Sequence, residues 1–244
     1  MADSLRFLNR KLRTLKNLIF PPRCMFCRKL LPVGSEMNGC LDCMKSLPYV
    51  EPAHCPVCGR VTPTGEIVCW RCSNKKPYYQ KHVSACYYEK GMKNAITAFK
   101  FRGKMYYYKD LGAILANYVY RPEVFDFVTS VPISEKRMRE RGYNQSELLA
   151  RRICEIGGLE YKDTLRRIKD RIPQNRLNYE QRQRNVRGAF AVVDDVKVAG
   201  KNILLVDDIF TTGATMNECA RVLGKAGTAS VFGLTLAMTK LQKE

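Results

Sequence analysis

Residues 202–216 read Asn-Ile-Leu-Leu-Val-Asp-Asp-Ile-Phe-Thr-Thr-Gly-Ala-Thr-Met. The pattern predicts a buried apolar strand over 203–206 that leads into Asp207 and Asp208, then a tight turn, then a helix over 215–226. Backbone N–H groups at a helix N-terminus bind phosphate, and Gly213 lets the chain approach it without a Cβ clash. Adjacent carboxylates suit ribose hydroxyls, from which they accept hydrogen bonds. The stretch therefore predicts a site for a ribose 5-phosphate group.

The same stretch resembles the phosphoribosyl-pyrophosphate (PRPP) signature of type I phosphoribosyltransferases over Leu204–Thr215. The resemblance implies that Asp207 and Asp208 hold the ribose as catalytic residues, with Mg²⁺ on the diphosphate. Residues of the turn would hold the phosphate: Thr211, Thr212, Gly213, Ala214 and Thr215. Dinucleotide binding is excluded for practical purposes, because no G-x-G-x-x-G follows a strand.

Strand and helix patterns alternate on both sides of this loop in the chain. Strands are expected at 82–88, 127–131 and 229–237, and helices at 92–101, 108–118 and 144–156. Such alternation is typical of a largely parallel sheet. We therefore expect an α/β, Rossmann-like phosphoribosyltransferase domain over 80–244.

The cysteines form a second pattern, because eight of the 11 fall in four CxxC pairs. Segment 23–78 also lacks periodic apolar positions, so it needs a metal to fold. Two pairs make a tetrahedral tetrathiolate site, and four pairs predict a double zinc ribbon with two Zn²⁺ ions. Regular spacing favours neighbouring pairs on one ion, while interleaved pairing, iron–sulfur and redox use stay open. The predicted ligands are Cys24, Cys27, Cys40, Cys43, Cys55, Cys58, Cys69 and Cys72. Cys86, Cys154 and Cys219 are expected in the core.

The N-terminal segment 1–22 is predicted to be a basic amphipathic helix that stops at Pro21-Pro22. Packing on protein is favoured over binding to a membrane or nucleic acid. No apolar run is long enough to cross a bilayer, and no signal peptide is recognised. The expected location is the cytoplasm.

The chain has a formal charge of +19, which favours a polyanionic partner. Two zinc tetrathiolates would lower it only to about +15. Residues 90–109 carry six basic side chains and no acidic one, with aromatic residues between them. Bases stack on aromatics while cations follow phosphates, so this segment is a candidate for single-stranded DNA. The candidate contacts are Lys100, Arg102, Lys104 and Tyr106.

A wider resemblance, to the ComF family of competence proteins, rests on Val131-Pro132-Ile133, Arg141-Gly142-Tyr143-Asn144-Gln145 and Gly188-Ala189-Phe190. It implies a zinc ribbon fused to a phosphoribosyltransferase domain, a role in DNA uptake during natural transformation, and partners in the competence machinery. The loop after the strand at 127–131 would face pyrophosphate in such a domain. Its candidate residues are Ile133, Ser134, Glu135 and Lys136.

Two function classes remain open. In the first, the chain binds PRPP and handles single-stranded DNA. In the second, it is an active phosphoribosyltransferase of nucleotide metabolism whose nucleophile is unknown. No segment is recognisable as a hood that would bind a nucleobase, so the sequence leaves enzyme activity undecided.

Overall fold

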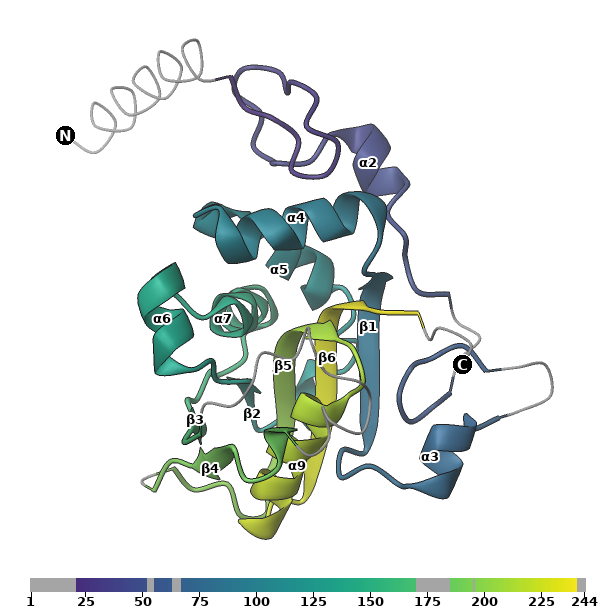
Figure 1. Cartoon of the computed structure of the whole chain (residues 1–244), viewed down its shortest axis with the longest axis vertical. Coiled ribbons are helices and arrows are strands. Elements are labelled where there is room, and N and C mark those ends of the chain that lie inside the picture. The colour runs from purple at the N-terminus through teal and green to yellow at the C-terminus, as the bar shows by residue number, and fades with distance from the viewer. Residues whose placement is uncertain (1–20, 52–54, 63–66, 170–184, 195, 241–244) are drawn as a thin grey trace.

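The structure is a computed structural model that describes residues 21–51, 55–62, 67–169, 185–194 and 196–240 (Figure 1). The helix predicted within segment 1–22 lies outside the described residues, apart from its last two positions.

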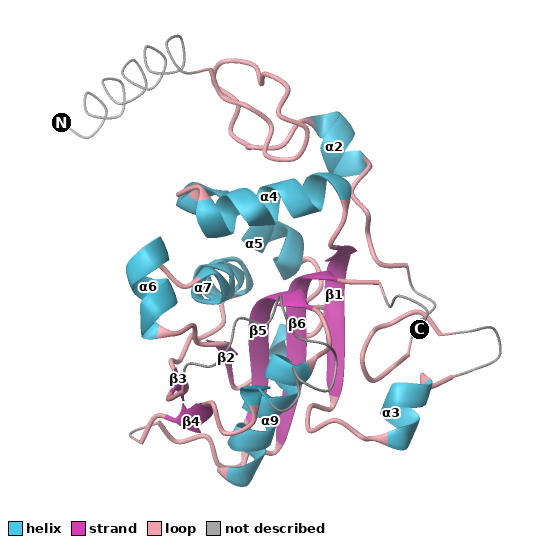
Figure 2. Ribbon diagram, in the orientation of Figure 1, coloured by secondary structure: helices cyan, strands magenta, loops and turns pink. Residues whose placement is uncertain are grey.

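A parallel sheet of four strands forms the centre of the molecule, in the order β1-β6-β5-β2 (Figure 2). The strands span Lys81–Tyr87 (β1), Phe127–Ser130 (β2), Asn202–Phe210 (β5) and Ser230–Met238 (β6). The predicted α/β fold with a largely parallel sheet is confirmed.

Strand β5 is longer than the sequence pattern predicts. Its pairing with β6 continues from Asp207 opposite Thr235 to Phe210 opposite Met238. Asp207 and Asp208 therefore lie inside the strand, and the prediction that the strand ends before them was wrong. The reason is that a paired neighbour holds polar residues extended as well as apolar ones.

Helices cover both faces of the sheet. Leu204 and Val206 of β5 belong to one buried cluster, and Ile203 and Leu205 belong to the other, as alternation along a strand requires. The first cluster contains residues of α4 (Lys90–Phe101), α5 (Tyr108–Ala116) and α7 (Gln145–Gly157). The second contains residues of α9 (Ala214–Lys225) and of the hairpin β3 (Leu165–Arg167) and β4 (Phe190–Val192).

Short elements complete the described chain. They are α2 (Leu41–Lys45), α3 (Trp70–Asn74), α6 (Glu135–Arg141), and the 3₁₀ turns η1 (Met105–Tyr107) and η2 (Pro122–Val124). Cys86, Cys154 and Cys219 are buried in the core as predicted. Among the described residues, no helix combines the length and apolar character needed to span a bilayer.

The cysteine-rich segment is built into the fold. Met25 and Phe26 belong to the buried cluster of α4 and α5, whereas Cys55 and Cys58 belong to the cluster of α9. The two halves of the segment therefore pack on opposite faces of the sheet. Figure 1 shows this separation, with α2 above α4 and α3 near the opposite end of β1. The predicted boundary near residue 79 is thus crossed by extensive packing.

Candidate functional site

The carboxyl end of β5 is the centre of the candidate site. Strand β2 pairs with β5 only as far as Ser130 opposite Val206, so β5 continues alone on that side. Ligands of open parallel sheets bind at this end of the strands. Asp207 and Asp208 therefore occupy the expected position for ligand contact.

Side chains distant in sequence hold the two carboxylates. The Ser146 hydroxyl and the Asp208 backbone N–H both donate to Asp207 Oδ1 at 2.8 Å. Lys100 Nζ donates to Asp208 Oδ1 at 2.7 Å, and both side chains are largely buried. Burial, with the neighbouring charge of Asp208, raises the pKa of Asp207 to about 7. The pair thus carries less than its full negative charge near neutral pH.

The segment Arg141-Gly142-Tyr143-Asn144-Gln145 connects α6 to α7 and supports this site. Gly142 ends α6 with a φ of 77°, a conformation that favours glycine. The Asn144 side chain caps α7 by accepting from Ser146 N at 3.1 Å, and it donates to the Val131 carbonyl at 3.1 Å. It therefore ties the start of α7 to the end of β2, which places Ser146 beside Asp207.

Arg141 contributes a positive charge near the carboxylates. It donates to Gln145 Oε1 at 2.6 Å, and its guanidinium lies 4.8 Å from the centre of the Phe101 ring. Burial and the charge of Arg137 lower the pKa of Arg141, while the charge of Asp208 raises it. An arginine remains protonated in proteins despite such shifts, so this side chain suits an anionic ligand.

The turn after β5 has the geometry expected of a phosphate-binding loop. Gly213 has a φ of 82° and precedes the first residue of α9. A Cβ at Gly213 would lie 2.7 Å from the Phe210 ring, so only glycine fits. Thr212 Oγ1 accepts from the Ala214 N–H at 3.3 Å, while Thr211 and Thr215 are partly exposed. The predicted phosphate residues therefore surround one helix N-terminus.

A buried histidine, His82, packs against Phe210, which precedes the turn. The His82 ring stacks on Phe210 with 3.8 Å between centroids, and burial lowers the pKa of His82 to about 3. Its neutral ring must donate from Nδ1 to the Cys58 carbonyl at 3.0 Å. Nε2 then accepts from the Thr235 hydroxyl at 3.0 Å. This chain of contacts joins the second cysteine site to the loop.

Arg60 makes a more direct connection. It is only 5% exposed, it donates to the carbonyl oxygen of Thr211, and its guanidinium lies 5.0 Å from the centre of the Phe210 ring. Nearby, the Tyr78 N–H donates to Asn217 Oδ1 in the first turn of α9 at 2.8 Å. The cysteine-rich segment therefore contacts both sides of the turn.

The candidate pyrophosphate residues follow β2. Ile133 is partly exposed, and Ser134 caps α6 by accepting from Arg137 N at 3.3 Å. Glu135 and Lys136 form the exposed first turn of α6. The segment starts where β2 separates from β5.

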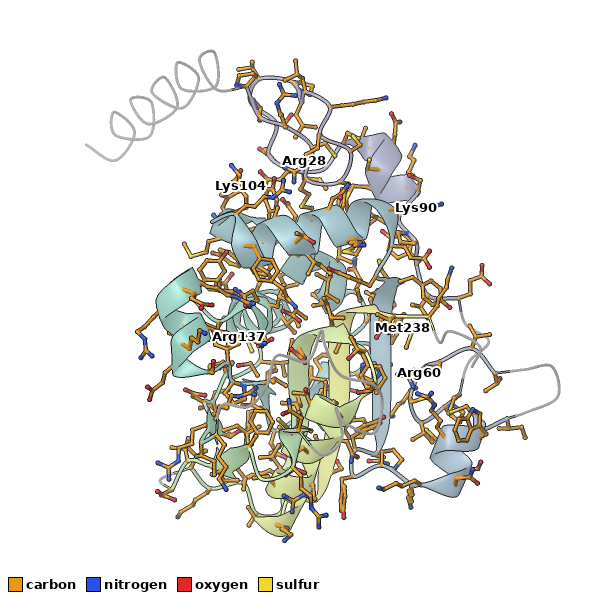
Figure 3. The ribbon with its side chains drawn as sticks, viewed as in Figure 1. Arg28, Arg60, Lys90, Lys104, Arg137 and Met238 are labelled. Atoms are coloured by element: carbon orange, nitrogen blue, oxygen red, sulfur yellow. The ribbon has the colours of Figure 1, made fainter. Side chains whose placement is uncertain are left out.

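The four DNA candidates separate into two groups. Lys100 belongs to the carboxylate site, because it pairs with Asp208. Arg102 and Tyr106 are exposed, and Lys104 lies 5.7 Å from the centre of the Tyr106 ring. Lys104 follows the last residue of α4, and in Figure 3 it lies in the same part of the view as Arg28.

The eight cysteines form two sites, and neighbouring pairs share each site as the spacing favoured. Cys24, Cys27, Cys40 and Cys43 make one cluster, and Cys55, Cys58, Cys69 and Cys72 make the other, with all sulfur atoms of a cluster within 4.8 Å of one another. A zinc tetrathiolate with Zn–S bonds of about 2.3 Å has S–S edges of about 3.8 Å. One sulfur pair of each cluster lies near this value, with 3.8 Å for Cys27–Cys40 and 3.6 Å for Cys58–Cys69. Both clusters fit Zn²⁺.

Comparison with known proteins agrees with both parts of the chain. The double zinc ribbon domain family matches residues 15–86, and the phosphoribosyl transferase domain family matches residues 174–244. The chain therefore combines a match to the double zinc ribbon family with a match to the phosphoribosyl transferase domain family. The predicted resemblance is therefore confirmed.

Relatives match this chain over most of its length. DNA utilization protein YhgH of Salmonella typhimurium is 29% identical over 88% of this chain and 96% of its own length. Competence protein F of Haemophilus influenzae is 28% identical over 88% of this chain and 97% of its own length. A solved allosteric regulatory enzyme of purine biosynthesis aligns at 26% identity with a TM-score of 0.37, covering 52% of this chain. This chain spans only 25% of that enzyme's chain.

Sequence reasoning missed several residues that complete the site. Ser146, Arg60 and His82 belong to no motif that points to the loop, and the sequence pattern assigns Lys100 to DNA alone. The sequence signal for Ser146 was its place directly after Asn144-Gln145, at the start of a predicted helix. Arg60 follows a CxxC-Gly turn, which gave no indication of its partner.

Proposed function

We propose that this chain binds PRPP with Mg²⁺ at the carboxyl end of β5. One observation carries the proposal: two adjacent carboxylates precede a glycine-containing turn and a helix N-terminus at the carboxyl end of a parallel strand. Carboxylates accept hydrogen bonds from ribose hydroxyls, and the helix N-terminus attracts the 5-phosphate.

Each surrounding group has a role in this proposal. Asp207 and Asp208 orient the ribose, while the Thr211–Thr215 turn holds the 5-phosphate. The diphosphate extends toward Ile133–Lys136, where Arg141 and Mg²⁺ would balance its charge. Lys100 donates to Asp208 at 2.7 Å and would hold this carboxylate in place for the ribose.

Calorimetry with PRPP and Mg²⁺ tests the proposal. The double variant Asp207→Asn, Asp208→Asn should lose measurable binding while keeping its zinc content and circular dichroism spectrum. The control is Asp42→Asn, Asp194→Asn, which removes two exposed carboxylates and should bind normally. Equal affinity of the native chain and the Asp207–Asp208 variant would remove the assignment.

We also propose that the protein binds single-stranded DNA in the cytoplasm during DNA uptake. The support is the charge of +19 and the names of its relatives, a DNA utilization protein and a competence protein. A cytoplasmic location accords with cysteines arranged for metal instead of disulfides. Arg102, Lys104 and Tyr106 are the proposed contacts near α4.

Fluorescence anisotropy of a labelled oligonucleotide over a salt series tests this second part. Arg102→Ala with Lys104→Ala should weaken binding and reduce the salt slope by roughly one unit or less for each phosphate that is no longer neutralised. The matched control Lys197→Ala with Lys225→Ala removes the same charge from positions elsewhere on the surface. Absence of binding at low salt would exclude a direct DNA role.

Active phosphoribosyl transfer is the second candidate. It is favoured by Arg137 and Arg141, whose charges act on each other near Asp208 where pyrophosphate would leave. Release of pyrophosphate from PRPP in the presence of a panel of nucleophiles would establish turnover. A panel that yields no release above the Asp207–Asp208 variant would restrict the site to binding.

A further inference from the structure

A pocket lies between the second cysteine site and the outer side of the phosphate-binding turn. Thr212, Gly213 and Asn217 form its wall on the transferase side. The opposite wall contains four cationic residues: Arg60, Arg71, Lys75 and Lys76. None of its described lining residues is acidic. Asp207 and Asp208 do not line it, so the pocket lies away from the proposed ribose contacts, although it shares Thr212 and Gly213 with the turn proposed to hold the 5-phosphate.

The charge of the pocket exceeds what the metal site needs. Four thiolates with one Zn²⁺ carry about −2, so four cations leave a surplus of about +2. Lys75 and Lys76 are exposed, and neither forms an ion pair with another residue in the described part of the chain. An anion would therefore find uncompensated positive charge here.

Arg60 adds a hydrogen-bond donor that is already removed from water. It is 5% exposed, and its Nε has no hydrogen-bond partner among the described residues. A buried donor without an acceptor is unfavourable, and an oxygen of a bound ligand would satisfy it. Its terminal nitrogen already donates to the Thr211 carbonyl, so the guanidinium is held in place.

Exposed aromatic rings border the same cations. Tyr78 lines the pocket and is 61% exposed, and Trp70 in α3 is 55% exposed. The Arg71 guanidinium lies 5.3 Å from the centre of the Trp70 ring. Nucleobases stack on such rings while cations follow the adjoining phosphates. A small inorganic anion would use the cations and leave the rings without a role.

From this arrangement we propose that the pocket, with Trp70 and Tyr78 at its edge, binds a phosphate group and a neighbouring base of single-stranded DNA. The surface is distinct from the Arg102–Tyr106 candidate near α4: Figure 3 shows Arg60 and Lys104 in different parts of the molecule. The proposal deepens the DNA part of the proposed function. It does not depend on PRPP binding.

Trp70 provides the measurement, because it is the only tryptophan of the chain. Its emission is recorded while a short oligothymidylate is added at low salt. We expect saturable quenching that weakens as salt rises, since a stacked base quenches the indole and counterions compete for the phosphates. Lys75→Ala with Lys76→Ala should raise the Kd by about three- to ten-fold, with Lys197→Ala, Lys225→Ala as the charge-matched control. The Trp70→Ala variant should bind the oligonucleotide about ten-fold more weakly, as measured by fluorescence anisotropy.

Three results would overturn the proposal. The first is the absence of quenching at low salt. The second is equal weakening by the Lys75–Lys76 variant and its control, which would reduce the effect to net charge. The third is full displacement of the oligonucleotide by an equal concentration of inorganic phosphate or of duplex DNA. Suppose that Arg102→Ala with Lys104→Ala abolishes the oligonucleotide binding measured by anisotropy, and that the native chain shows no Trp70 quenching. The DNA role then belongs to the α4 surface alone.

Discussion

The two cysteine sites have the same local structure and different surroundings. In each, the first cysteine donates its N–H to a carbonyl five residues later at 2.8 Å, from Cys24 to Lys29 and from Cys55 to Arg60. The residue after the second cysteine has a positive φ in both, 70° at Arg28 and 71° at Gly59. The third cysteine of each site precedes a five-residue helix, α2 or α3.

What differs is the element on which each site packs. At the first site, Phe26 lies against Gly91, and its carbonyl accepts from Asn94 of α4 at 3.0 Å. At the second site, Arg60 contacts Thr211 of the proposed phosphate-binding turn, and the Cys58 carbonyl contacts His82. The first site is therefore a stabiliser of the helical layer, and the second is part of the wall of the candidate ligand site. The same four-cysteine site can therefore either stabilise a helical layer or form part of a ligand site.

The largest expected effect concerns stability at the first site. Phe26 is 1% exposed, so Phe26→Ala should lower the free energy of unfolding by about 3–5 kcal/mol. The equivalent residue of the second site is Val57, which is partly exposed, and Val57→Ala should cost about 1 kcal/mol. Urea unfolding of zinc-loaded protein measures both. Equal destabilisation would contradict the assignment of the first site to core packing.

Replacing one metal-binding cysteine of the second site should change the affinity for PRPP, whereas the same replacement in the first site should not. Cys58→Ser should weaken PRPP binding by about ten- to a hundred-fold, equivalent to ~1.4–2.8 kcal/mol, because the support beneath Phe210 and Thr211 is loosened. Cys27→Ser changes the matching position of the first site and should leave the affinity within about two-fold. Calorimetry with PRPP, together with zinc content of each variant, provides the comparison. Similarly weakened binding in both variants would mean that the sites act on the fold as a whole.

A single side-chain contact should account for part of this difference. Arg60→Gln removes the donor to the Thr211 carbonyl and should raise the Kd for PRPP about ten-fold, or ~1.4 kcal/mol. Lys29 occupies the matching position at the first site, and Lys29→Gln should have no effect on affinity. Titration calorimetry on both variants at one salt concentration decides the matter. Normal binding by the Arg60 variant would restrict the second site to a structural role.

The smallest expected effect is a pH dependence of stability that arises from Asp207. The folded pKa of Asp207 is about 7, against an ordinary value of 3.8, so the folded state holds this proton more tightly than the unfolded state. The stabilisation is therefore complete below about pH 4 and is lost as pH rises to about 7. Asp207→Asn should gain stability relative to the native chain as pH rises from 5 to 8, because the native chain must ionise this buried carboxyl over that range. Thermal unfolding of the unliganded proteins across this range measures it, and a pH-independent difference would contradict the raised pKa.

Short sequence motifs predicted the features that depend on residues close together in the chain. The CxxC pairs predicted both metal clusters, and the regular spacing favoured the pairing that the structure has. The strand–turn–helix pattern of 202–216 predicted a glycine-dependent turn at the end of a central strand. The end of β5 was misplaced, because its last residues are held by β6 rather than by their own apolarity.

Within this chain, the sequence by itself determined the two four-cysteine clusters, the alternation of strands and helices, and the glycine-containing turn after β5, since each depends on residues close together in the chain. Only the tertiary structure decided which residues surround that turn. Ser146 lies 61 positions from Asp207, Lys100 lies 108 from Asp208, and Arg60 lies 151 from Thr211. Contacts over such separations depend on sheet order and on helix packing, which no short motif records. For that reason the chain shows two similar zinc sites in sequence, and their unequal relation to the ligand site appears only after folding.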